Sequence, residues 1–208
     1  LLLFGGQVTN EGLGRLRKLR KLDNLDLYVE GTTTAGISQL DGLPALRDLT
    51  VYGFQTDDTT LNLGNLKTLE MFNLNAKGPL RDEDLACVSG LSRLRWLQVG
   101  GDHLFTDTAL ANLAGLSELD RLCLMGPGIT DHGLTYLANL KKLNTLTLAG
   151  RFTDQGLRSL EGINDLNWVH LYSSEDISET ATARLRAVLP NVQIFNVESN
   201  RALPAAPV

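Results

Sequence analysis

The chain contains few of the residues that build catalytic, metal or disulfide sites. Only two cysteines occur in 208 residues, Cys87 and Cys123, and they are far apart and lack metal-ligand spacing. The three histidines are scattered along the chain. No phosphate loop, dinucleotide fingerprint, nucleophile elbow or H-E-x-x-H motif is present. We therefore predict no enzymatic activity, no cofactor and no metal site.

A surplus of positive charge is also missing. Acidic residues outnumber basic ones by 24 to 19, and the net charge of −5 leaves no basic excess to neutralise phosphates, so we predict that nucleic acid is not a partner. No apolar run approaches the ~20 residues of a membrane span, and Leu1–Phe4 is too short for a signal-peptide core. We expect a soluble protein without a membrane span. The absence of N-x-S/T sequons favours the cytoplasm, although compartment and oligomeric state stay open.

Leucine recurs with a long period. The first apolar residue of each strand-like segment falls at Leu25, Leu49, Phe72, Leu97, Leu122, Leu146, Val169 and Val192. Successive members are 23 to 25 residues apart. Within one period the apolar residues follow at steps of three and close with a step of two, as at Leu134, Leu137, Leu140, Leu143, Leu146 and Leu148. The step of two indicates a short strand, and the steps of three indicate a short helix or 3₁₀ segment.

One period opens with Ile129-Thr130-Asp131-His132-Gly133-Leu134. This motif and the period resemble the leucine-rich repeat family, most closely its ribonuclease-inhibitor-like variety in bacterial arrays, over Leu1 to about Val197. The resemblance implies an α/β fold, a right-handed leucine-rich-repeat solenoid or horseshoe arc. Parallel strands are expected on its concave face and short helices on its convex face. The family serves many partners, so the resemblance leaves the partner open.

Two kinds of residue punctuate each repeat. A threonine and an aspartate start each helix, at Thr106-Asp107, Thr130-Asp131 and Thr153-Asp154. The threonine suits an N-cap and the acid suits the helix dipole, so we interpret these acids as structural. Glycines precede the first helical leucine or follow the strand, where the chain must turn sharply, and we interpret both placements as marking the boundaries of the repeat's elements. They are Gly12, Gly36, Gly133 and Gly156 in the first group and Gly31, Gly53, Gly101, Gly126 and Gly150 in the second.

The repeats are expected to fill residues 1–197 as one domain of about eight repeats, the first partial and the last a cap. Leu1–Phe4 reads as the end of a strand from a preceding repeat, which suggests an N-terminal truncation. Leu63 lies one position early, so the third repeat should be distorted. The cap is predicted to be a longer amphipathic helix with an apolar face of Ile177, Ala181, Leu185 and Val188. Residues 198–208 are expected to form a flexible tail containing proline and alanine.

Strand alternation places the residues that flank the inward leucines on the concave face. Both tryptophans and three of the four tyrosines fall at such positions, although aromatic residues make up 6% of the chain. Tryptophan, tyrosine, arginine and methionine are enriched at interface cores, so we predict a partner-binding surface there. Its members are Asp26, Tyr28, Tyr52, Trp96, Arg121, Met125, Trp168, His170 and Tyr172.

Two contacts are expected within this surface. Trp96 and Arg121 should form a cation–π contact on adjacent strands. Tyr28 and Tyr52 should form a second neighbouring pair. Large side chains covering an exposed sheet are the alternative interpretation.

The other polar residues do not form catalytic or metal sites. His170 and Cys123 share a column but lie two strands apart, at roughly 10 Å, which is too far for a Cys/His catalytic pair. We expect His170 to contact a ligand or solvent. The run Asp82-Glu83-Asp84 lacks the loop ligands of a calcium site and is expected to be a solvated first helical turn. His103 and His132 are also expected to be solvated.

The predicted function is a protein-binding module that recognises a protein or peptide on its concave face. One alternative is a recognition segment of a larger enzyme or a ubiquitin-ligase adaptor, which the sequence upstream of Leu1 would reveal. A structural spacer is a further alternative, and it predicts that substitutions on the concave face leave function unchanged.

Overall fold

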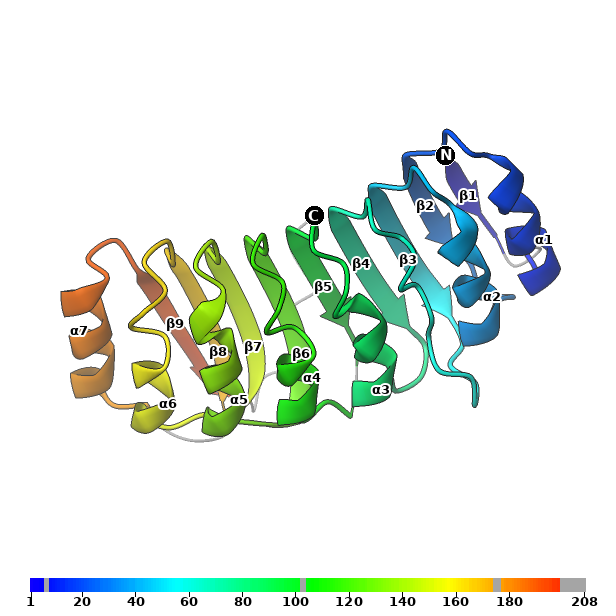
Figure 1. Cartoon of the computed structure of the whole chain (residues 1–208). Coiled ribbons are helices and arrows are strands. Elements are labelled where there is room, and N and C mark those ends of the chain that lie inside the picture. The colour runs from blue at the N-terminus through cyan, green and yellow to red at the C-terminus, as the bar shows by residue number, and fades with distance from the viewer. Residues whose placement is uncertain (6–7, 102–103, 174–176, 199–208) are drawn as a thin grey trace.

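The computed structural model describes residues 1–5, 8–101, 104–173 and 177–198, and these form one open sheet with a layer of helices. Nine parallel strands follow one another in chain order across the sheet (Figure 1). They are β1 (Leu2–Phe4), β2 (Asn24–Tyr28), β3 (Asp48–Phe54), β4 (Met71–Ala76), β5 (Trp96–Gly100), β6 (Arg121–Thr130), β7 (Thr145–Arg151), β8 (Trp168–Ser173) and β9 (Gln193–Glu198). His103 and the tail from residue 199 lie outside the described residues.

Short helices connect the strands and lie together on one side of the sheet (Figure 1). The α-helices are α1 (Asn10–Arg15), α2 (Thr34–Ser38), α3 (Asp82–Leu85), α4 (Asp107–Ala111), α5 (Asp131–Thr135), α6 (Asp154–Arg158) and α7 (Glu179–Val188). Several continue into 3₁₀ turns, namely η1 (Leu16–Lys18), η2 (Gln39–Gly42), η3 (Ala86–Val88) and η4 (Tyr136–Asn139). The sheet face that carries no helices is called the concave face below.

The hydrophobic core lies between the sheet and the helices, where the period places its leucines in register. Leu122 pairs with Leu146, and Leu146 pairs with Val169 on the next strand. All three side chains are buried. Full burial of such a side chain contributes about 1.5–3 kcal/mol, so each repeat depends on its neighbours for most of its stability.

The acids at the helix starts link consecutive repeats. One carboxylate oxygen of Asp107 accepts the backbone N–H of Thr130 at 2.7 Å, and the other accepts the Thr130 hydroxyl at 2.7 Å. The same Thr130 oxygen accepts the N–H of His132 and caps α5. Equivalent pairs are Asp82 with Thr106, Asp131 with Thr153, and Asp154 with Ser178. The predicted structural role of these acids is confirmed, and the pairs are called the carboxylate ladder below.

The ladder explains why glycine precedes the first leucine of two helices. Gly133 and Gly156 lie inside α5 and α6, and a Cβ at either position would overlap the carboxylate of Asp107 or Asp131. These two glycines precede the first helical leucine as expected, and their small size makes room for the preceding repeat. Gly53 does have the expected turn conformation, with φ +85°, where the register of β3 shifts.

The predicted distortion of the third repeat is present. Residues 56–70, all of which are described, contain no helix, and the chain runs from β3 to β4 through turns. Leu61 and Leu63 still point into the core. The layer of helices is therefore interrupted between α2 and α3.

The last repeat differs from expectation in register and in its helix face. Val169 pairs with Ile194 rather than with Val192, so the final period is 25 residues long. In α7, Leu185 is buried as predicted, but Val188 is exposed and Leu189 packs inward in its place. The helix ends at Val188, so the chain turns toward β9 at that point.

Candidate functional site

Three columns of side chains run across the concave face, because the parallel strands are in register. The first column contains Asn24, Asp48, Met71, Trp96, Arg121, Thr145, Trp168 and Gln193. The central column contains Leu2, Asp26, Thr50, Asn73, Gln98, Cys123, Thr147, His170 and Phe195. The third column contains Phe4, Tyr28, Tyr52, Asn75 and Gly100, and then Met125, Ala149 and Tyr172 on β6 to β8.

An aromatic stack occupies the β1–β3 end of the third column. The ring centroids of Tyr28 and Tyr52 lie 5.2 Å apart with an interplanar angle of 8°, which confirms the predicted pair. Phe4 extends the stack from the other side of Tyr28 at 5.0 Å. The Tyr52 hydroxyl accepts a hydrogen bond from the Asn73 amide at 2.8 Å. The stack is thereby anchored at its Tyr52 end.

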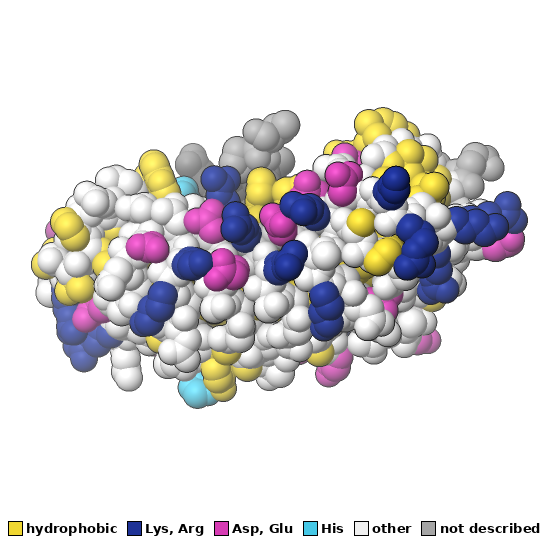
Figure 2. Space-filling model, turned by 45° about the horizontal axis from the view of Figure 1, so that its top comes forward, with side chains coloured by type: hydrophobic (Ala, Val, Ile, Leu, Met, Phe, Trp, Pro, Cys, Tyr) yellow, Lys and Arg dark blue, Asp and Glu magenta, His cyan; other side chains and the backbone are white. Residues whose placement is uncertain are grey.

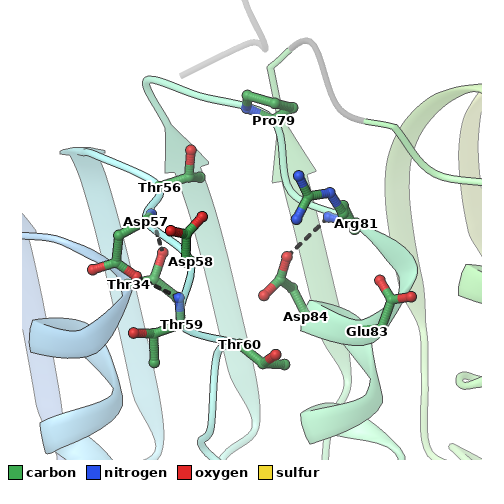
Figure 3. A pocket seen from close by; sticks show the side chains of 10 residues that line it. All are labelled: Thr34, Thr56, Asp57, Asp58, Thr59, Thr60, Pro79, Arg81, Glu83 and Asp84. Atoms are coloured by element: carbon green, nitrogen blue, oxygen red, sulfur yellow. Dashed lines mark hydrogen bonds between the residues drawn. The ribbon is translucent and has the colours of Figure 1, made fainter.

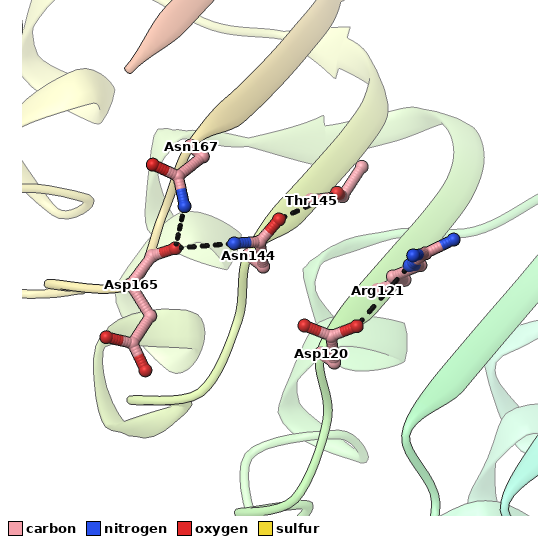
Figure 4. Close-up of polar contacts among 6 residues, drawn as sticks. All are labelled: Asp120, Arg121, Asn144, Thr145, Asp165 and Asn167. Atoms are coloured by element: carbon pink, nitrogen blue, oxygen red, sulfur yellow. Dashed lines mark hydrogen bonds and ion pairs between the residues drawn. The ribbon is translucent and has the colours of Figure 1, made fainter. Parts of the chain in front are cut away.

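A cation–π pair lies near the middle of the face. The guanidinium carbon of Arg121 is 5.4 Å from the ring centroid of Trp96, as the sequence predicted. The Nε of Arg121 also lies 3.4 Å from a carboxylate oxygen of Asp120, an ion pair drawn in Figure 4. Both contacts involve exposed or half-buried groups and hold the guanidinium over the first column.

A second aromatic cluster lies on β8 and β9. The rings of Trp168 and Phe195 are nearly parallel with centroids 6.3 Å apart, and Phe195 stacks on His170 at 4.6 Å. Trp168 is 46% exposed and Phe195 is 43% exposed, so both present apolar area to solvent. Burial lowers the pKa of His170 below its usual value of 6.5. Tyr172, half-buried, follows His170 on the same face of β8.

The predicted surface residues therefore lie on one face but form separate groups. Tyr28 and Tyr52 belong to the stack at β1–β3, and Trp96 lies with Arg121 on β5 and β6. Residues Trp168, His170 and Tyr172 all lie on β8. Asp26 and Met125 are half-buried. Thr50, which flanks the inward Leu49 and therefore lies on the concave side, is nevertheless buried within the central column.

Sequence reasoning missed two aromatic members of this face, Phe4 and Phe195. Phe195 is an outward residue whether the alternation starts at Val192 or at Ile194, but the predicted surface ended at Tyr172 on the preceding strand. Counting the alternation back from Ile194 would have placed Phe195 opposite His170. Phe4 belongs to a strand with a single inward residue, Leu3, so the two-residue pattern that marked the other strands was absent.

Some of the charged side chains along the edge where the strands begin form ion pairs. Figure 2 shows Lys and Arg side chains interleaved with Asp and Glu side chains over this edge. Arg47 pairs with Glu70 at 3.5 Å, and Lys142 pairs with Glu118 at 2.7 Å. Farther along the edge, polar groups bind backbone, and the Asn144 and Asn167 amides both donate to the carbonyl of Asp165 (Figure 4). Such exposed pairs contribute little to stability.

A hollow of about 300 Å³ lies beside the helix-free segment, on the opposite side from the columns. Its lining includes Asp57 and Asp84 (Figure 3). Asp84 accepts the backbone N–H groups of Leu61 and Arg81. Burial opposes ionisation of Asp57, but hydrogen bonds from Thr33, Thr59 and Ala35 outweigh it and lower the pKa of this carboxyl. These two carboxylates thus accept hydrogen bonds that hold the helix-free segment in place.

The structure also corrects the interpretation of Asp82-Glu83-Asp84 as a merely solvated turn. Asp82 belongs to the carboxylate ladder, and Asp84 binds two backbone N–H groups. Within the part of the chain that the structure describes, no group of three or more histidine, cysteine or acidic residues could hold a metal ion.

The thiols are separated from groups that could activate them. Cys123 is two strands from His170, with Thr147 between them in the column. Burial raises the pKa of Cys123 to about 11. Burial also raises the pKa of Cys87 to about 12, and this thiol donates a hydrogen bond to the Asp84 carbonyl. Neither thiol is suited to act as a nucleophile near neutral pH.

Comparisons with known proteins identify the architecture. No protein-family model matches the chain, and no curated protein matches it. Among solved structures it is similar to internalin InlF from Listeria monocytogenes, with 25% identity and a TM-score of 0.68 over 90% of this chain and 51% of that one. Internalin C2 from the same species gives 24% identity and a TM-score of 0.71, covering 92% of this chain and 77% of that one. The chain thus spans about half the length of InlF and three quarters of internalin C2.

A third similar structure is TLR13 in complex with ssRNA13, with 18% identity and a TM-score of 0.59 over 91% of this chain and 27% of that one. Together the likenesses establish a leucine-rich repeat solenoid of the α/β class. Because TLR13 was solved with RNA, this fold by itself does not exclude nucleic acid as a partner. The prediction that nucleic acid is not a partner therefore rests on the charges of this chain. Among the described helices, none has both the length and the apolar composition needed to cross a membrane.

Proposed function

We propose that this solenoid is a protein-binding module whose concave face recognises a protein or peptide. The observation that carries the proposal is the exposed aromatic area at the β8–β9 end, where Trp168 and Phe195 are each more than two-fifths exposed. Solenoids use the concave surface created by their curvature for binding. Exposed tryptophans supply large rigid contact area there with little loss of side-chain entropy.

The charges of the same face favour a protein over a nucleic acid. Among the described residues of the three columns, Arg121 is the single arginine or lysine. Its guanidinium is already engaged by Trp96 and Asp120. Two carboxylates, Asp26 and Asp48, lie on the same face and would repel a phosphate backbone.

Recognition rather than catalysis also fits the absence of activated groups among the described residues of the columns. Cys123 and His170 are held apart, and the thiol carries a raised pKa. The ribonuclease-inhibitor-like repeat type and any fusion to a larger enzyme or adaptor are not needed for this proposal.

The test is a comparison of proteins retained from an extract of the source organism by the native chain and by the double variant Trp96→Ala/Trp168→Ala. The double variant should lose the specific partners, because truncating an interface hot spot costs about 2 kcal/mol or more, or about 30-fold in affinity. Gln155→Ala, on the exposed side of α6, is the control and should retain them. Identical partner lists for all three proteins, each verified as folded, would favour a structural spacer instead.

A further inference from the structure

The concave face is divided by charge along its length. Over β2 and β3 it carries two carboxylates, Asp26 and Asp48, beside the stacked Tyr28 and Tyr52. From β4 onward, no acidic residue occurs in the described parts of the columns. The only formally charged side chain there is Arg121, and the β8–β9 end is aromatic.

The charge of the Asp26 carboxylate is not compensated within the protein. Within the described residues it has no ion pair and no hydrogen-bonded partner. Glu70 and Glu118, on the edge, are paired with Arg47 and Lys142. Asp48 has only a long contact, 3.4 Å, with the neutral Asn24 amide. Two negative charges on this end of the face therefore remain for an incoming cation.

The positions of these groups suit one long basic side chain. Asp48 is the diagonal neighbour of Asp26 on the adjacent strand, which places their Cβ atoms about 7–8 Å apart. Tyr28 follows Asp26 on the same face of β2 and is 42% exposed. A lysine or arginine can lay its methylene stem along such an aromatic surface while its charged head reaches the carboxylates.

The distance to the other end of the face sets the length of the partner. Six strand spacings of about 4.8 Å separate β2 from β8, or roughly 29 Å. An extended peptide advances about 3.3–3.6 Å per residue, so about nine residues cover that span. At the far end, Trp168 and Phe195 offer apolar area and no negative charge.

Building on the proposed binding function, we propose that the partner is an extended basic peptide segment. It places a lysine or arginine against Asp26 and Asp48, and an apolar side chain about nine residues away against Trp168 and Phe195. The carboxylates then determine which way along the arc the segment lies, because reversal would put the cation over an aromatic end without carboxylates.

The experiment is a selection of random 15-residue peptides displayed on phage against the native protein and two double variants. Asp26→Asn/Asp48→Asn removes the concave carboxylates. Asp58→Asn/Glu83→Gln, in the exposed lining of the hollow, makes the same change in net charge away from the columns. Thermal unfolding confirms that each variant is folded before selection.

Peptides selected by the native protein and by the Asp58/Glu83 variant should be enriched in lysine and arginine by about threefold or more over the input library. That enrichment should fall to the input level with Asp26→Asn/Asp48→Asn, while the preference for an apolar residue persists. Selected peptides without basic enrichment, or with enrichment that persists in the concave variant, would overturn this inference and leave peptide binding intact.

Two other results would also bear on the proposed binding function. If no peptide were selected by the native protein, both this inference and peptide binding as the function would be lost. Retention of a fluorescent single-stranded 20-nucleotide RNA by the native protein, strengthened by Asp26→Asn/Asp48→Asn, would replace the basic peptide with a nucleic acid as occupant.

Discussion

The carboxylate of Asp131 holds Thr153 of the next repeat through both of its oxygens. One accepts the backbone N–H at 2.9 Å and the other accepts the hydroxyl at 2.5 Å. Asn10 makes the amide version of this contact with Thr33, accepting the N–H through Oδ1 and donating from Nδ2 to the hydroxyl. The same contact therefore occurs once with a charged carboxylate and once with a neutral amide, which indicates how to test whether the ladder requires the charge.

Asp131→Ala is expected to destabilise the fold by about 1–2 kcal/mol, because two hydrogen bonds between repeats are lost at a partly exposed site. Asp131→Asn should cost less than half as much, since Asn10 shows that an amide can bind in the same way. Urea denaturation of both variants measures the difference. Equal losses for the two variants would show that the charge, and not the geometry, carries the contact.

Leu146→Ala should lower the free energy of unfolding by about 2–5 kcal/mol, because the side chain is fully buried between Leu122 and Val169. Chemical denaturation gives the value directly. Thr145→Ala, one residue earlier on the concave face, is the matched control and should change stability by less than about 1 kcal/mol. A similar loss for both variants would contradict the assignment of the inward face.

The carboxylate ladder should make stability fall in acid. Hydrogen bonds from the Ser178 hydroxyl and N–H lower the pKa of Asp154 below 3.8. Its contribution is thus fully present above pH 3.8 and is lost as the pH falls through the lower pKa of the folded state. Unfolding midpoints of Asp154→Asn measured from pH 6 to pH 2 should depend less on pH than those of the native chain. The variant Asp58→Asn, outside the ladder, should keep the native dependence.

His170 should titrate below pH 6.5 in the folded protein, because burial lowers its pKa. Its neutral form then favours folding above pH 6.5, and that contribution is lost as the pH falls through the pKa of the folded state. Proton NMR of the imidazole gives the midpoint, with the resonance assigned by its absence in His170→Gln. A midpoint at or above the value found in urea would contradict the buried position beside Phe195.

Cys123 should react slowly with a thiol reagent in the folded state. Burial raises its pKa from 9.0 to about 11, so the reactive thiolate is about 100-fold scarcer at pH 8 than in the unfolded chain. Ellman's reagent measures the rate in the Cys87→Ser variant, with and without urea. Comparable rates in the two conditions would show that the thiol is exposed.

The regular part of the fold follows from the sequence because its two periods are physical requirements. Leucines three residues apart share one side of a short helix, and the closing pair of residues such as Leu146 and Leu148 must point the same way from a strand. The outward positions then follow from alternation alone. This is why the Tyr28–Tyr52 and Trp96–Arg121 contacts could be predicted before any coordinates.

Prediction failed where a position is set by contacts with another repeat. The reason for glycine at position 133 is not visible in its own repeat, because its small size is required by the Asp107 carboxylate of the preceding repeat. Phe195 is outward by alternation, but a cap helix longer than the usual one shifted the last register, so its place opposite His170 could not be predicted from the spacing. Which aromatic side chains of the concave face contact one another also depends on their rotamers and on stacking with Phe4 and Phe195. The spacing of residues in the sequence does not give this information.

The helix-free stretch at residues 56–70 has a consequence for how the molecule opens. In a solenoid each repeat is stabilised by its two neighbours, so unfolding spreads until it meets a weak interface. Between α2 and α3 the sheet is continuous, whereas the helix layer is not. Amide protons of β1–β3 should therefore exchange with solvent as one cooperative unit and those of β4–β9 as another. The position of one missing helical turn, rather than the number of repeats, therefore determines how many strands unfold together.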